Sequence, residues 1–430
     1  MNAMPRLLLC LFCAQSVVGA AADAVTPRDL SRLTLVQADR LFVERNREVQ
    51  LAQRAVDGAL ADTLSAGQLP NPNLSIGTSQ IPRSNGQPFG SGGPRDKLVD
   101  TTFGLSQLFE RGDKRALRIG AAEQGVEASR KDLLDVLRQQ RVALAGAYYD
   151  LLLAQNRETI SAESAGLFDK TLQAADLRLK AGDVAPNDVA RIRVDALRAQ
   201  NDARSARADR EKAQAALAYL IGAEKQARDI RAIDEFPMVR APGEGPPIEQ
   251  VVEQRADVAG AQARVRLAEK QRDLARAQRT RDITAGVQYE HFPGDGSNNT
   301  LGVSISIPLF INYNFDGEIR RAEVGLEAAQ DNLERVRALA RGEISRARAD
   351  LDAATERVER FQGVLLREAQ KAADAAEFAY SKGALGVMDL LDARRTLRAT
   401  RIEAIIAQAD YAKSLTAWQA AIAVPAGAPQ

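Results

Sequence analysis

"AAEQGVEASRKDLLDVLR", residues 121–138, returns in altered form two hundred residues later as "RAEVGLEAAQDNLERVRA", residues 321–338. Seven residues recur unchanged 200 positions later: Ala122, Glu123, Gly125, Glu127, Ala128, Leu133 and Val136. Further along, at a shift of 201, Gly182 falls on Gly383 and Asp188 falls on Asp389. A register that holds over about 60 residues indicates a tandem duplication, so one plan must describe both halves of the chain.

Each copy begins with a helix of moderate length, at about 34–67 and at about 248–280. In the first copy, apolar residues recur every seven positions, at Leu35, Phe42, Val49 and Val56. This spacing is typical of a helix that packs along one seam. The stretch "LPNPN", 69–73, ends that helix because proline lacks an amide hydrogen and asparagine favours turns.

Two alternating segments follow in each copy and predict a β-hairpin. In "TTFGLSQLF", 101–109, Phe103 and Leu105 alternate with Gly104 and Ser106. In "LGVSISIPLF", 301–310, apolar residues at 301, 303, 305, 307 and 309 alternate with Gly302, Ser304 and Ser306, which is the period of a strand. Their partners are predicted at 73–81 and 282–290, so the hairpins span 73–109 and 282–310. Loops rich in glycine, proline, serine and asparagine connect the strands at 82–98 and 291–299.

A very long helix follows each hairpin, at 114–181 and at 317–382, since both regions lack proline. The first would extend about 100 Å at 1.5 Å per residue. After a glycine turn, each copy closes with a helix at 187–221 or 387–423. The expected organisation is thus a first repeat at 25–221, a proline-rich linker at 222–247, a second repeat at 248–423 and a tail at 424–430.

Residues 1–24 have the pattern of a secretory signal peptide, in which Arg6 precedes an apolar run and a stretch of small residues. Cleavage is expected after Ala20, Ala22 or Ala24. The alternative is a lipoprotein signal that uses Cys10 or Cys13, but neither cysteine follows a small residue. The mature chain would then hold no cysteine.

The composition argues against a nucleic-acid partner, because 58 lysines and arginines balance 57 aspartates and glutamates and no basic stripe stands out. The only histidine, His291, falls in a predicted outer loop. Without a cluster of histidine, cysteine or methionine, the sequence predicts no metal site and no cofactor. It also shows no glycine-rich phosphate loop and no nucleophile triad, so no catalytic residue is predicted.

The strands combine one apolar face with one face of small and polar residues, which suits a membrane barrel around a water-filled lumen. The expected lipid-facing residues are Phe103, Leu105, Val303, Ile305 and Ile307. Four strands cannot close such a barrel, because closed barrels start at about eight strands and open edges are costly in lipid. Several copies would have to share one barrel. The alternative is two hairpins that cap a soluble helical bundle.

The whole mature chain resembles the TolC-like outer-membrane efflux proteins. "SQLFERGDKR" (106–115), "IPLFINYNFDGEIRRAE" (307–323) and "YSKGALGVMDLLDA" (380–393) are most similar to the heavy-metal, cobalt–zinc–cadmium type branch. The resemblance implies a mainly α fold with a small membrane β part. In this fold, a homotrimer forms a twelve-stranded β-barrel that continues into a periplasmic α-helical barrel.

The same resemblance implies a protein of the outer membrane that extends into the periplasm and contacts outer-membrane lipid. It would be a passive duct, working with a periplasmic adaptor (membrane fusion) protein and an inner-membrane proton-driven pump of the resistance-nodulation-division type. Three alternatives stay open: the duct of a drug efflux pump, the duct of a type I protein-secretion system, and a periplasmic coiled-coil scaffold with no pore.

By this resemblance the two glycine turns lie at the periplasmic tip, where the adaptor would contact Arg178, Leu179, Gly182 and Gly383. Tyr380 and Asp188 would connect neighbouring helices and keep the tip closed. Asp389 and Asp392 would face the lumen at its constriction. Two plainer interpretations stand beside these roles. Asp188 could cap or charge the start of a helix, and Asp389 and Asp392, which share a helix face, could be solvated.

Overall fold

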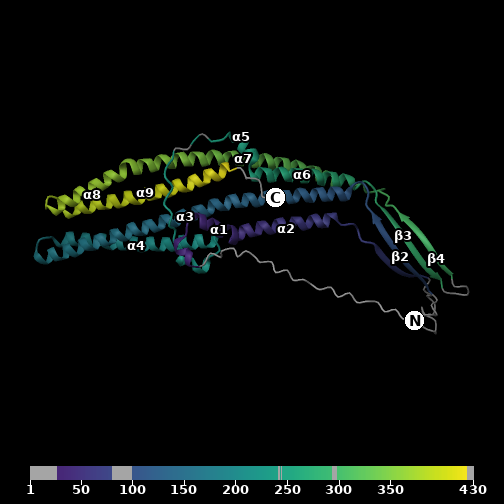
Figure 1. Cartoon of the computed structure of the whole chain (residues 1–430), viewed down its shortest axis with the longest axis horizontal. Coiled ribbons are helices and arrows are strands. Elements are labelled where there is room, and N and C mark those ends of the chain that lie inside the picture. Colours follow the sequence, from purple (N-terminus) through teal and green to yellow (C-terminus); the bar gives the residue numbers. More distant parts are fainter. Residues whose placement is uncertain (1–26, 80–98, 241–242, 244, 293–297, 424–430) are drawn as a thin grey trace, which may run out of the picture.

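The computed structural model describes residues 27–79, 99–240, 243, 245–292 and 298–423. The signal peptide expected at 1–24, the loop at 82–98, most of the loop at 291–299 and the tail at 424–430 lie outside the described residues. The described helices form a long rod, and a small sheet lies at one end of it (Figure 1). The prediction of a mainly α fold with a small β part is confirmed.

The same order of elements occurs twice along the chain. The first half consists of η1 (Pro27–Arg32), α1 (Leu35–Arg45), α2 (Arg47–Gly67), β1 (Asn73–Ser79), β2 (Asp100–Phe109), α3 (Lys114–Ala181) and α4 (Pro186–Leu220). The linker contains a short 3-10 helix, η2 (Glu224–Asp229). The second half consists of α5 (Ile248–Gln254), α6 (Ala256–Ala277), β3 (Ile283–Phe292), β4 (Asn298–Ser306), α7 (Asp316–Arg360), the π-helical turn η3 (Phe361–Leu365), α8 (Leu366–Ser381) and α9 (Val387–Ile422).

The leading helix of each copy is broken in two, where the sequence predicts one helix. Asn46 has an extended backbone, and its side-chain oxygen accepts the N–H groups of Glu48 and Val49, so it starts a new helix. Arg255 breaks the second copy's leading helix with the same extended backbone. Neither position carries the proline or glycine that marks a helix boundary in a sequence.

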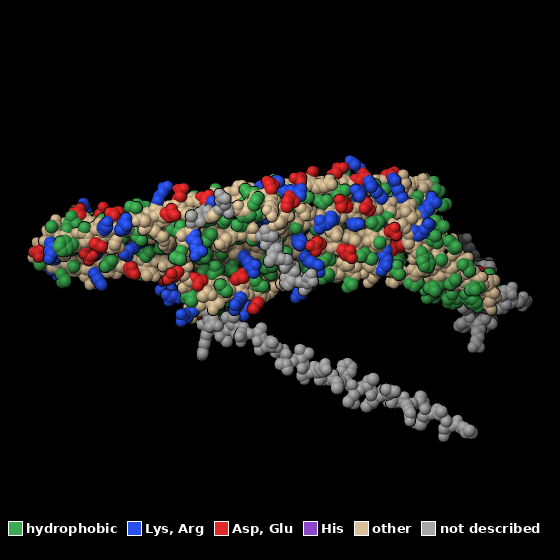
Figure 2. Space-filling model, turned by 45° about the horizontal axis from the view of Figure 1, so that its top comes forward, with side chains coloured by type: hydrophobic (Ala, Val, Ile, Leu, Met, Phe, Trp, Pro, Cys, Tyr) green, Lys and Arg blue, Asp and Glu red, His purple; other side chains and the backbone are tan. Residues whose placement is uncertain are grey.

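The four strands pair antiparallel in the order β1-β2-β3-β4. Directly opposed residues share a face of the sheet. One face carries two apolar rows, which are Leu74, Leu105, Val287 and Val303 in one row and Ile76, Phe103, Tyr289 and Leu301 in the next. The other face carries rows such as Asn73, Ser106, Gly286 and Ser304. The apolar side chains are exposed, and Figure 2 shows hydrophobic groups gathered at this end of the molecule.

Two predictions about the strands are wrong. The second hairpin ends at Ser306 and not at 310, because Pro308 has no N–H to donate to a ladder, so Ile307 lies beyond the strand. His291 belongs to β3 and not to an outer loop, and it lies opposite Thr101 in the sheet. Its Nδ1 atom is 2.8 Å from the side-chain oxygen of Asn299 on β4.

The long helices carry the rest of the fold. Helix α3 contacts α2, α4, α6 and α9 along its length, and a core at the middle of the rod surrounds Tyr148. The Tyr148 hydroxyl lies 2.9 Å from the Leu33 carbonyl oxygen and 2.9 Å from the Asp234 carboxylate, which fixes the linker to the first copy. None of the described helices is both long enough and apolar enough to cross a membrane.

The second long helix is not one uninterrupted α-helix over the predicted range 317–382. It is continuous from α7 to α8, but η3 interrupts the α-helical hydrogen bonding between them. The N–H of Leu366 donates to the carbonyl oxygen of Phe361, five residues earlier. This is the hydrogen-bond spacing of a π-helix.

Candidate functional site

Both long helices end in glycine turns at the end of the rod that is far from the sheet (Figure 1). Gly182 has a φ of +85° and Gly383 a φ of +73°, a conformation that glycine adopts without strain. The N–H of Asp183 donates to Arg178 O at 2.9 Å, and the N–H of Ala384 donates to Ala379 O at 2.9 Å. The two copies thus end their long helices with the same hydrogen-bonded turn.

The two turns contact each other through Arg178 and Tyr380. Arg178 Nη1 donates to the Tyr380 hydroxyl at 3.0 Å, and its guanidinium carbon lies 5.6 Å from the centre of the ring. A cavity of about 540 Å³ lies between the turns, and its lining includes Val184 and Leu385. Tyr380 therefore joins the end of α8 to the end of α3 within one chain.

Of the predicted acidic residues, Asp188 lies in the first turn of α4 and Asp389 in the first turn of α9. Asp188 does not cap α4, because Ala185 is the N-cap residue and the helix has no side-chain capping bond. Its charge still lies near a helix N-terminus, where an anion is favourable. Asp389 is exposed at the equivalent place on α9. Asp392 lies one turn further along, is 79% exposed and approaches Arg395 at 3.8 Å. One exposed face of α9 therefore presents two carboxylates.

The residues that join α4 to α9 just behind the tip are not among those predicted from the sequence. Asp195, whose side chain is only 8% exposed, forms an ion pair with Arg395. Asp202, two turns further along α4, pairs with Arg398, one turn further along α9. Leu391 is fully buried in a cluster with residues of α3 and α4. An aspartate on one helix and an arginine on another do not reveal their pairing until the helices are placed side by side.

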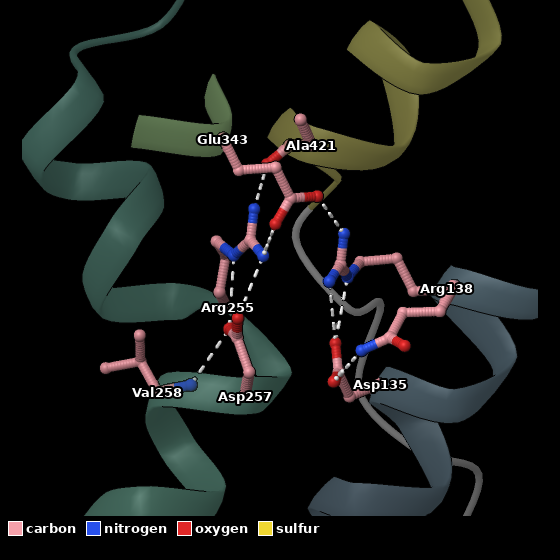
Figure 3. A network of polar contacts seen from close by, with 8 residues as sticks. Asp135, Arg138, Arg255, Asp257, Val258, Glu343 and Ala421 are labelled. Atoms are coloured by element: carbon pink, nitrogen blue, oxygen red, sulfur yellow. Dashed lines mark hydrogen bonds and ion pairs between the residues drawn. The ribbon is translucent and has the colours of Figure 1, made fainter. Parts of the chain in front are cut away.

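A second polar cluster lies at the break between α5 and α6, where Arg255 is fully buried (Figure 3). Its Nη2 atom is 2.8 Å from an Asp257 oxygen and 2.7 Å from a Glu343 oxygen, and its Nη1 donates to Ala421 O at 3.2 Å. Arg138 reaches Glu343 from α3 at 2.6 Å. This network, in which Arg255 is buried and Glu343 is partly exposed, joins four helices: α3, α6, α7 and α9.

The charges of this network hold one another ionised. Burial would raise the pKa of Glu343, but Arg138 and Arg255 outweigh it and hold that pKa below its ordinary value. Burial also opposes the ionised form of Asp257, and hydrogen bonds from Arg255 leave its pKa lowered as well. Burial would lower the pKa of Arg255, yet its two carboxylate partners leave it raised. The arginine is therefore a permanent cation in the interior.

The described residues contain no group of three or more histidine, cysteine, aspartate or glutamate side chains that could hold a metal ion. The features that stand out at the tip are charge and shape: an exposed acidic face, two glycine turns and an arginine–tyrosine contact. Such a surface can attract cations and contact another protein.

The outer membrane efflux protein family matches residues 40–223 and 248–424, which are the two copies. The chain belongs to this family. It is 26% identical over 392 residues to the cobalt-zinc-cadmium resistance protein CzcC of Cupriavidus metallidurans, covering 90% of each protein. Among solved structures it is similar to the CmeC outer membrane channel of Campylobacter jejuni, with a TM-score of 0.75 and 17% identity over 97% of this chain and 94% of that one. It is also similar to the outer membrane protein VceC of Vibrio cholerae, with a TM-score of 0.72 and 18% identity over 90% of this chain and 95% of that one.

The family resemblance inferred from the sequence is thereby confirmed. The chain is an outer-membrane efflux protein that extends into the periplasm. The exposed apolar face of the sheet is the part suited to lipid, and the helical rod is the part that extends away from it.

Proposed function

We propose that three copies of this chain form a passive exit duct for heavy-metal cations, the outer-membrane part of a tripartite efflux complex. The sheet supports this most directly, because β1 and β4 end it and its apolar face is exposed. Open edges are costly in lipid. Pairing β4 of one copy with β1 of the next removes every edge, and three copies supply twelve strands, a number that closes a barrel.

The helical tip is the part that we assign to partners. Arg178 is exposed there, and Leu179, Gly182 and Gly383 lie beside it at the end of the rod furthest from the sheet. We assign these residues to contact with a periplasmic adaptor protein. The inner-membrane proton-driven pump would supply energy and selection, so that this chain provides a passage and catalyses no reaction.

The cargo is proposed from two observations. The first is the similarity to a protein named for cobalt, zinc and cadmium resistance. The second is the exposed carboxylate pair of Asp389 and Asp392, which threefold symmetry would repeat around an axis. Crowded carboxylates attract cations and raise the local concentration of divalent ions. Asp188 and Tyr380 complete this candidate constriction.

A deletion strain tests the function. We expect greater sensitivity to Co²⁺, Zn²⁺ or Cd²⁺, which a plasmid with the wild-type gene restores. Sensitivity to organic drugs alone would favour a drug efflux duct, and loss of a secreted polypeptide would favour a type I secretion duct. Recovery of the protein as a soluble periplasmic monomer would leave only the scaffold interpretation.

A further inference from the structure

The second copy has one residue more than the first between the matched helices and the glycine turns. The shift is 200 at Leu133 and Leu333 but 201 at Gly182 and Gly383. The extra residue must therefore lie between 333 and 383, a stretch that the structure describes throughout. Within it, η3 is the one turn with π-helical hydrogen bonds, whereas α3 is α-helical from Lys114 to Ala181. A π turn holds one extra residue in a widened turn.

Residues on the sheet side of η3 are held firmly. Phe361 packs against the apolar cluster of Leu351, Val358 and Tyr411, and the guanidinium of Arg357 lies 6.0 Å from its ring centre. The Tyr411 hydroxyl accepts the N–H of Arg240 at 3.1 Å, which ties this cluster to the linker. The helix is therefore fixed up to the π turn.

Beyond η3 the second copy is held much more loosely. Helix α8 buries only Ala373, whereas the corresponding part of α3 buries Phe168 and Ala175. Helix α9 has no buried residue between Leu391 and Ala404. The contacts of this part of α9 with the first copy are ion pairs of exposed or half-buried side chains, Arg401 with Glu163 at 4.0 Å and Arg398 with Asp202. A buried apolar contact returns only at the tip, where Leu391 is buried and Arg395 pairs with Asp195.

We propose that η3 is a hinge created by a one-residue insertion in the second copy alone. It lets α8 and the adjoining part of α9 bend away from α3 and α4, while the helix on its sheet side stays fixed. The bending would separate the tip contacts of Leu391 and Arg395 and move the acidic face that carries Asp389. Its role in the channel rests on the proposed function.

The π turn also explains how an insertion can be tolerated. One extra residue in a straight α-helix would rotate every later side chain by about 100° around the axis. When the extra residue is held in a widened turn, the side chains before and after that turn keep the directions they would have in a helix without the insertion. Removing Gly363 should therefore leave an α-helix whose tip residues point as before. An added Cβ at Gly363 meets nothing within 4 Å, so alanine fits there as well.

The test compares matched changes in the two copies. Deletion of Gly363 should still give membrane-inserted trimers, whereas deletion of Ala162 at the matching place in α3 should prevent assembly. Gly363→Ala should slow amide hydrogen exchange across 366–381 by about fivefold, the ratio set by the helix preference of alanine over glycine. Gly166→Ala, where a Cβ also has free space, should leave that exchange unchanged.

Two results would overturn the hinge. If deletion of Gly363 blocks assembly as deletion of Ala162 does, η3 does not absorb an insertion. If Gly363→Ala leaves exchange of 366–381 unchanged, bending does not occur there. Planar-bilayer conductance tests the proposed function independently of the hinge. Wild-type protein that inserts but conducts no ions would contradict the duct, while assembly and exchange would still decide on the hinge.

Discussion

Asn46 and Arg255 occupy the same place in the two copies, and each donates to a carbonyl near the end of its copy's last helix. Asn46 Nδ2 donates to Leu220 O at 3.0 Å, and Arg255 Nη1 donates to Ala421 O at 3.2 Å. The two acceptors are separated by 201 residues, the shift of the repeat itself. One copy therefore joins its first and last helices with a neutral amide, and the other uses a buried cation that needs carboxylates around it.

This difference predicts unequal costs of substitution. Arg255→Ala removes the partner of the half-buried Asp257 and one of the two arginines that hold Glu343, which keeps Arg138. It should lower the free energy of unfolding by about 3 kcal/mol, the low end for breaking a buried pair. Asn46→Ala removes neutral hydrogen bonds and should cost about 1–2 kcal/mol. Urea denaturation of the detergent-solubilised protein, followed by circular dichroism, compares the variants. Arg54→Ala, at an exposed ion pair, is the control and should cost less than about 1 kcal/mol.

The network also predicts how stability depends on pH. The pKa values of Asp257 and Glu343 are lowered in the folded protein, so their contribution is present above the unfolded values of about 3.9 and 4.3. It is lost as the pH falls through the lower folded values. Stability should therefore change little through this network between pH 7 and 5 and fall below about pH 4. Glu343→Gln should weaken that acid-induced decline, and an unchanged decline would contradict the assignment.

The two faces of the sheet predict opposite responses to arginine. Ile305 is 70% exposed on the apolar face, so Ile305→Arg should cost about 2–4 kcal/mol of insertion free energy near the membrane midplane. Ser304 lies on the opposite, polar face, and Ser304→Arg should insert nearly as well as wild type. The measurement is the fraction of protein recovered as trimer from outer membranes. The reverse order of the two variants would show that the faces are assigned the wrong way round.

Much of the fold could be predicted because the determining signals are local. Proline-free stretches and glycine turns place α3 at Lys114–Ala181 and its turn at Gly182, both as the structure has them. The helix breaks at Asn46 and Arg255 could not be predicted. The local cap at Asn46 is joined by a bond to an α4 carbonyl, and Arg255, which makes no cap bond, donates to an α9 carbonyl. Both carbonyls come close only when the copy has folded.

The candidate site shows the same limit. Glycines and a pair of aspartates identify the tip, because their roles follow from local backbone geometry and helix spacing. The contacts of Arg178 with Tyr380 and of Asp195 with Arg395 each join residues about two hundred positions apart. The π turn lies between these cases: the change of shift shows that a residue was added, but only the structure shows where it lies.

The Arg178–Tyr380 contact predicts a specific change in gating. Tyr380→Phe removes the hydroxyl that accepts from Arg178 at 3.0 Å but keeps the ring beneath the guanidinium. A single hydrogen bond of about 1 kcal/mol corresponds to a roughly fivefold higher ratio of open to closed channels. Bilayer recordings should show this rise in basal conductance. Arg178→Lys keeps the charge but loses the planar group, and it should give a similar rise. Wild-type conductance in both variants would show that the contact does not hold the tip closed.

The acidic face of α9 gives the last prediction. Asp389 and Asp392 are exposed one helical turn apart, so Asp389→Asn together with Asp392→Asn removes two charges per copy with little change in side-chain size. If these carboxylates line a constriction, the double variant should lose cation selectivity and block by divalent or trivalent ions.

The trimer should remain as stable as wild type, because neither carboxylate is buried. The control removes the same charge from α8, at the exposed Glu368 and Asp374, by Glu368→Gln with Asp374→Asn. It should leave selectivity and cation block unchanged, since those residues lie about two to four helical turns behind the Gly383 turn. Reversal potentials in a salt gradient, with and without periplasmic-side divalent ions, give the answer. If the Asp389 and Asp392 variant behaves like the control, the two carboxylates are only a solvated helix face, and the constriction must be formed by other residues.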